Sequence, residues 1–331
     1  MTTHTWGTAG TISGLANNQQ GNVISQNLAT MVQGGAAPTT VTTGFSSLAG
    51  IWWHDTTNNQ VKVRDQADTA WILVGSVDET NKLFTAAASG IAAIQGAVKN
   101  LKVSTVTGAV AITADEIVLE TSGNTYAVAR NVAVTANPAS SGANGLDTGT
   151  FATNTWYAVW IITNGSTVAS LLSTSATAPT MPSGYTYKAR VGWVRSNATP
   201  ALYPVQQVDR RAQYIVDGTI LTSLRKIKSA GSSVGSISTP TYVAQSVSTF
   251  VPPTAGVIRL VVGASGGTSR QFMLAPNANY GAANSLSNPP PINGGGLDLY
   301  LTTDMVLESS NLYFTGEANT FIACLGWEDN L

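Results

Sequence analysis

The chain has 331 residues and a formal net charge of −1, and only 10% of its residues are charged, against about 25% in ordinary soluble domains. It has no basic stripe of the kind that attracts nucleic acid, and no run of 18 apolar residues that would predict a membrane span. A hydrophobic content of 43% is enough for a core. So few charges favour a surface covered by copies of the same chain. The alternative is a β-protein with a Ser/Thr/Asn surface.

The cysteine content excludes an intrachain disulfide, because Cys324 is the single cysteine of the sequence. It lies in the apolar run 321–325, so we expect an inert thiol in the core. Residues 1–30 lack the basic and then apolar segments of an export signal. The sequence therefore predicts synthesis in a cytosol without signal-directed export.

The N-terminal region, residues 1–85, contains weak helical spacing over 15–32 and then an aromatic segment at 51–75. Trp52, Trp53 and Trp71 place three large side chains in 25 residues. We expect two short strands, each carrying tryptophan, joined by the polar turn 55–59.

This segment, which reads WWHDTTNNQVKVRDQADTAW, resembles tail-fibre and appendage proteins of tailed bacteriophages. In those proteins a similar segment recurs near the N-terminal end. The resemblance implies a virion component that binds a partner and converts no substrate. It also implies that residues 1–85 attach the chain to other virion proteins.

A connector is expected at residues 86–100. Ile91, Ile94 and Val98 have the i, i+3, i+7 spacing of a short helix, which could pack against its copies on a threefold axis. Gly90 and Gly96 equally favour an extended stem.

Residues 101–216 predict a β-sandwich. The run 156–162 and its return strand 168–173 flank Asn164-Gly165, which is typical of a hairpin with a two-residue type I′ turn. Both faces of 156–162 are apolar, so this strand should be central and buried on both sides. The segment from Trp156 to Arg195 also resembles a domain found in phage tail fibres. The resemblance implies a shaft or spacer.

Residues 217–331 predict a C-terminal β-domain, jelly-roll-like, built from several short strands separated by turns. The segment 275–296 is rich in Pro, Gly and Asn and is expected to be irregular. The predicted fold class is thus mainly β, with several β-sandwich-like domains and a short helical or extended connector.

The candidate receptor contacts lie in this irregular segment, because Asn and Tyr supply hydrogen bonds and rigid contact area at low charge. They are Asn277, Asn279, Tyr280, Asn284 and Asn288. The alternative is a purely structural loop. Tryptophans 52, 53, 156 and 160 could stack on sugar rings, but core packing is the favoured interpretation.

Catalytic and metal-binding patterns are weak. His4 and His54 lie in no cluster with Cys or carboxylates, so we expect no metal and no cofactor. His54-Asp55 resembles a base and its orienting acid, yet no nucleophile has a recognisable context and a turn is favoured. Glycan cleavage requires paired carboxylates. The acids considered for that role are Asp115, Glu116, Asp298, Asp304 and Glu308.

The resulting hypothesis is a homotrimeric tail fibre or appendage, made in the host cytoplasm and incorporated into the virion. It would attach to a host glycan or protein by multivalent binding, and it would not be an enzyme. The alternatives are a capsid decoration or head-fibre protein, and a glycan-degrading appendage enzyme.

Overall fold

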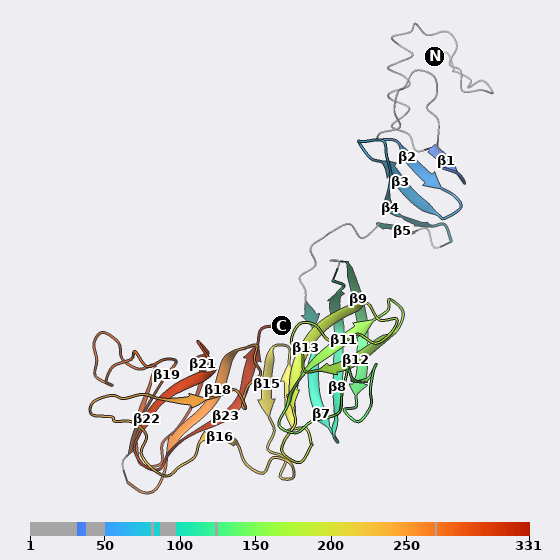
Figure 1. Cartoon of the computed structure of the whole chain (residues 1–331). Helices are drawn as coiled ribbons and strands as arrows, with labels where there is room; N and C mark the ends of the chain where they lie inside the picture. The colour runs from blue at the N-terminus through green and yellow to red at the C-terminus, as the bar shows by residue number, and fades with distance from the viewer. Residues whose placement is uncertain (1–31, 38–49, 81–82, 87–96, 123–124, 269) are drawn as a thin grey trace, which may run out of the picture. The chain divides into compact units, whose positions relative to one another are not determined.

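The structure is a computed structural model that describes residues 32–37, 50–80, 83–86, 97–122, 125–268 and 270–331 (Figure 1). Every regular element in these ranges is a β-strand, so the predicted mainly-β class is confirmed. The chain divides into two compact units, Met1–Ile91 and Ala92–Leu331. The helical spacing at 15–31 and most of the connector, residues 87–96, lie outside the described residues.

The first unit holds a five-stranded sheet in the order β1-β2-β3-β4-β5 (Figure 1). Its strands are β1 (Val32–Gly34), β2 (Trp52–Asp55), β3 (Gln60–Arg64), β4 (Trp71–Asp78) and β5 (Leu83–Ala86). The prediction of two tryptophan strands joined by one turn was wrong, because β3 lies between β2 and β4. Val61 and Val63 supply the strand pattern that the large tryptophans obscured.

The tryptophans nevertheless organise this sheet. Trp53 is buried and its ring lies 5.3 Å from that of Trp71 in an edge-to-face arrangement. Lys62 Nζ lies 4.7 Å from the Trp53 ring centroid, a cation–π contact. Trp52, in contrast, is 40% exposed. The core interpretation therefore holds for Trp53 and does not hold for Trp52.

The second unit contains a sheet of fourteen strands, which runs β10-β12-β11-β13-β8-β7-β14-β15-β23-β18-β21 with β6, β9 and β16 off this path. The strands on the N-terminal side are β6 (Val98–Lys99), β7 (Lys102–Val106), β8 (Ala109–Glu120), β9 (Tyr126–Ala136), β10 (Gly145–Leu146), β11 (Trp156–Thr163), β12 (Val168–Ser173), β13 (Tyr187–Arg195), β14 (Val205–Val208) and β15 (Arg211–Tyr214). The strands on the C-terminal side are β16 (Arg225–Lys228), β18 (Ala255–Ala264), β21 (Tyr300–Val306) and β23 (Thr320–Asp329).

Strand β11 lies between β12 and β13 and is buried from Tyr157 to Thr163, as its apolar faces predicted. The connecting turn differs from the prediction. Four residues, 164–167, join β11 to β12. Of Asn164 and Gly165, only Gly165 has a positive φ, 93°, whereas a type I′ turn requires a positive φ at both. The Asn164 side chain accepts hydrogen bonds from the main-chain N–H groups of Ser166 and Thr167, which favours the longer loop over a type I′ turn.

The C-terminal part is a sandwich. A four-stranded sheet in the order β17-β22-β19-β20 faces the β23-β18-β21 end of the large sheet (Figure 1). Its strands are β17 (Val243–Ser246), β19 (Arg270–Ala275), β20 (Ile292–Gly296) and β22 (Asn311–Gly316). Buried Leu260 and Ile322 of one sheet share a hydrophobic cluster with Phe272 and Phe314 of the other, so the core fills the space between the two layers.

The two β-domains predicted at 101–216 and 217–331 lie within one compact unit. Strand β15 pairs with β23, so the large sheet continues across residue 216. Gly326 makes this pairing close, because a Cβ at that position would lie 2.0 Å from the Ala212 carbonyl oxygen. Any larger residue would force the two strands apart.

Candidate binding site

The C-terminal loop, residues 276–291, joins β19 to β20 and is held by contacts of its own. Tyr280 packs against a small buried cluster that contains Tyr242 and Met273. The Tyr242 hydroxyl donates to the main-chain carbonyl of Gly281 at 3.0 Å. Strand β20 begins at Ile292, so the irregular segment is shorter than the 275–296 expected.

The predicted contact residues divide into two groups. Asn288 is used by the loop itself, since its Nδ2 donates to the Asn279 carbonyl at 2.8 Å and its Oδ1 accepts from Ser285. Tyr280 is half-buried. Asn279 and Asn284 are exposed and present their side chains to solvent. All five predicted residues lie in this loop, but of the four other than Asn277, only Asn279 and Asn284 have side chains that are free to contact a partner.

One exposed residue of this loop was missed. Leu286 is fully exposed between two serines, Ser285 and Ser287. A lone leucine in a polar segment carries no periodic signal, so the sequence could not separate it from core leucines. A single exposed leucine is common on protein surfaces, so Leu286 is a candidate contact only together with the exposed asparagines of the same loop.

Asn277 links the loop to a neighbouring pocket. Its Nδ2 donates to Glu308 Oε2 at 2.7 Å, and Glu308 lines a pocket of about 520 Å³. We call this the Trp156 pocket. Its lining comes from the start of β11, the residue after β12, β13, the loop 247–254 with the first residue of β18, and the loop 307–310. The residues are Trp156, Thr174, Trp193, Val247, Ser248, Val251, Pro252, Pro253, Ala255, Leu307, Glu308, Ser309 and Ser310.

Trp156 is fixed in this pocket from several sides. Its indole Nε1 donates to the Ser248 carbonyl at 2.9 Å. Its ring meets those of Trp193 and Trp327 edge-to-face, at 6.4 and 5.4 Å. The Arg195 guanidinium lies 5.9 Å from its centroid. Such a ring is held rigidly before any ligand arrives.

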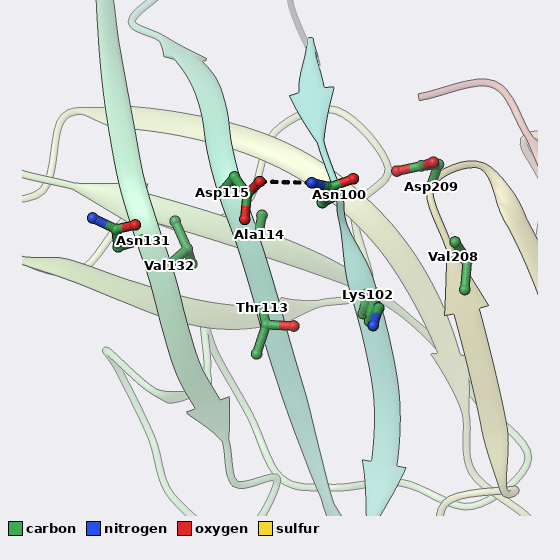
Figure 2. A pocket seen from close by; sticks show the side chains of 9 residues that line it. All are labelled: Asn100, Lys102, Thr113, Ala114, Asp115, Asn131, Val132, Val208 and Asp209. Atoms are coloured by element: carbon green, nitrogen blue, oxygen red, sulfur yellow. Dashed lines mark hydrogen bonds between the residues drawn. The ribbon is translucent and has the colours of Figure 1, made fainter.

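A second pocket, of about 500 Å³, lies between β7, β8, β9 and β14. Figure 2 shows its lining, in which the Asn100 amide faces the Asp115 carboxylate and donates to it at 2.6 Å. Asp209 is used structurally, because its Oδ1 accepts the Leu101 main-chain N–H. Lys102 also lines this hollow. This hollow has no aromatic side chain and is a weaker candidate than the Trp156 pocket.

The acids considered for glycan cleavage are dispersed. Adjacent Asp115 and Glu116 lie inside β8, and Asp115 accepts the Asn100 amide. Glu116 pairs with Arg130, Asp304 with Arg211 and Arg259, and Asp298 accepts the Gly266 N–H. Among the hydrogen bonds of the described residues, none joins two of these acids.

The His54-Asp55 pair takes the turn geometry. Asp55 is buried and accepts the main-chain N–H groups of Thr57 and Asn58, the Asn58 amide, and Lys62 Nζ at 2.8 Å. These hydrogen bonds, that from the Asn58 side chain first and that from Lys62 second, lower the pKa of the Asp55 carboxyl to about 2. His54 lies in β2.

Within the described ranges, no group of three or more His, Cys, Asp or Glu residues could hold a metal ion. The same residues include no helix that is long and apolar enough to cross a membrane. His4 lies outside the described residues.

Comparison with protein families identifies part of the second unit. Residues 102–191 match the family model described as Mtd second domain, Mtd being the major tropism determinant, a phage receptor-binding protein. These residues run from β7 into β13 and include Trp156. No curated protein and no solved structure matches the chain. The expected similarity to phage virion proteins is therefore confirmed for this one domain.

Proposed function

We propose that the chain is a virion protein of a tailed bacteriophage that binds a receptor on the host surface. The observation that carries this proposal is the similarity of residues 102–191 to a domain of a phage receptor-binding protein. It agrees with the resemblance of residues 51–75 to tail-fibre and appendage proteins, which rests on a different part of the chain.

The C-terminal loop supports the binding role. It presents exposed Asn279, Asn284 and Leu286 on a segment that is tied down by Asn288 and Tyr242. A polar, nearly uncharged loop with one apolar anchor suits recognition, because little conformational freedom remains to be lost on binding. The role requires no bond to be made or broken.

Assembly as a homotrimer completes the proposal. The charged fraction of 10% favours a chain that covers part of its surface with its own copies. Several linked sites raise the effective concentration of each weak contact. Residues 1–85 would attach the trimer to other virion proteins, and residues 101–216 would serve as a spacer.

Two experiments test this function. Immunogold labelling of purified particles should place the protein on the tail or its appendages, and label on the capsid would support a decoration or head-fibre protein instead. Host cells preincubated with the purified chain should adsorb fewer particles. Unchanged adsorption at a saturating concentration of the chain would contradict receptor binding.

The catalytic alternative has its own measurement. The purified chain is incubated with host polysaccharide and newly formed reducing ends are counted. We expect none above the control without protein. Product in molar excess over the chain would show turnover and would replace binding with glycan cleavage.

A further inference from the structure

We propose that the Trp156 pocket binds a neutral saccharide. This inference rests on the proposed receptor-binding function, since it names the chemical class of the receptor and the site that takes it. It is carried by the combination, in one hollow, of a fixed indole, an apolar floor, a rim of hydroxyl groups and a single carboxylate.

The size and floor of the pocket fit one or two sugar rings. Its volume of about 520 Å³ lies within the range of about 300 to 1,000 Å³ that is typical of small-molecule sites. Trp193, Val251 and Pro252 are buried beneath it. A sugar ring has an apolar C–H face, which gains free energy by covering such a surface and the neighbouring indole of Trp156.

The rim supplies the polar contacts. Ser248, Ser309 and Ser310 are exposed at its edge and can both donate and accept hydrogen bonds. Glu308 offers a carboxylate, which accepts hydrogen bonds more strongly than a neutral group does. Sugar hydroxyls match both kinds of group. Within the protein, Ser248 and Ser309 already bond to Ser246 and Asn311. A purely apolar ligand would add no hydrogen bond to the remaining capacity of the rim groups, whereas sugar hydroxyls would.

Charge selects a neutral saccharide over an acidic one. Glu308 is the only charged residue among the thirteen that line the pocket. A carboxylate, sulfate or phosphate on the ligand would be repelled by Glu308 at this rim. The nearby Arg195 is not among the lining residues: it is buried and donates to the Asn154 and Ser196 carbonyls.

Asn277 acts here as a positioning residue. Its amide holds Glu308 Oε2 at 2.7 Å, which fixes the direction of the carboxylate at the rim. The bond runs from the C-terminal loop to the pocket, so both belong to one recognition surface. The role assigned to Asn277 is therefore to orient Glu308 and not to contact the receptor directly.

The test uses the full chain and an array of neutral and acidic oligosaccharides, followed by titration of one bound neutral oligosaccharide. Ser310→Trp places an indole at the exposed rim and should abolish binding. Ser233→Trp is the matched control, because Ser233 is an exposed loop serine outside the pocket, and it should bind as the parent chain does. Glu308→Gln should weaken binding roughly tenfold.

Asn277→Ala should weaken binding by less than Glu308→Gln, and combining the two changes should add little to the loss caused by Glu308→Gln alone. Additive losses would contradict the positioning role. Binding of acidic glycans alone, equal binding by Ser310→Trp, or no binding to the array would overturn the saccharide site.

These results separate the two proposals. If the purified chain still blocks adsorption while Ser310→Trp blocks equally well, the receptor-binding function stands and this pocket is not its site. If the chain does not block adsorption at all, the proposed function itself is contradicted.

Discussion

Trp156 and Ser248 are joined by a hydrogen bond of 2.9 Å from the indole Nε1 to a main-chain carbonyl. Trp156 belongs to the segment that matches the Mtd second domain, and Ser248 lies beyond it, in the loop after β17. The bond therefore ties the matched domain to the C-terminal sandwich at the wall of the Trp156 pocket.

Replacing Trp156 with Phe should lower the free energy of unfolding by about 1 to 2 kcal/mol, since it removes the donor and part of the ring contact. Urea denaturation of the full chain measures the change. Tyr300→Phe is the control, because Tyr300 is 56% exposed, and it should change the value by less than about 0.5 kcal/mol. Equal effects of the two changes would show that the indole contributes nothing specific.

The buried ion pair between Arg190 and Asp329 should be far more sensitive than an exposed one. The two side chains are 12% and 1% exposed, and Asp329 also accepts the Thr254 hydroxyl. Asp329→Asn leaves the Arg190 charge uncompensated and should cost about 3 to 5 kcal/mol. Asp304→Asn, in a pair whose side chains are 49% and 42% exposed, should cost less than about 1 kcal/mol. Urea denaturation of each variant, compared with the parent chain, measures both losses in the free energy of unfolding.

Acid should destabilise the first unit through Asp55. Its pKa is lowered from 3.8 to about 2 in the folded chain, so between about pH 4 and pH 2 the unfolded chain binds more protons. The stabilisation is present above this window and is lost as the pH falls through it. Carboxyl NMR shifts should show Asp55 titrating near pH 2. Asn58→Ala removes the largest cause and should raise the pKa, and an unchanged titration would refute this assignment.

Cys324 should be unreactive in the folded chain. It is fully buried, and burial raises the pKa of its thiol to about 12, so little thiolate forms at pH 8. Alkylation by iodoacetamide should be slow in buffer and rapid in denaturing urea. Fast alkylation of the native chain would place this thiol outside the core.

Sedimentation should give a species about three times the chain mass of 34.2 kDa. This follows from the expected covering of a weakly charged surface by copies of the chain. A monomer at micromolar concentration would contradict the trimer.

The sequence predicted local features well where side-chain pattern and burial coincide. The apolar run 156–162 identified a central strand, and the position of Cys324 in an apolar run identified a buried thiol. It failed where a strand is short and polar, as at β3, and where side-chain hydrogen bonds replace a tight turn, as at Asn164.

The site could be predicted only in part, because it depends on distant pairings. Asn277 was identified as a polar loop residue, but its contact with Glu308 arises from the fold. Trp156 was interpreted as core, and it is half-buried and lines a pocket. The residues that line the pocket come from segments between positions 156 and 310. A local sequence pattern cannot predict that segments so far apart in the sequence lie together in the fold.

The pairing of β15 with β23 joins two segments of the second unit that lie far apart in the sequence. Arg211 pairs with Glu328, more than a hundred residues later in the sequence. This edge of β15 therefore has no strand partner until the chain has been synthesised as far as β23. A chain truncated before β23 would leave that edge unpaired, and unpaired strand edges favour aggregation. The large sheet therefore reaches its full width only when β23 is in place.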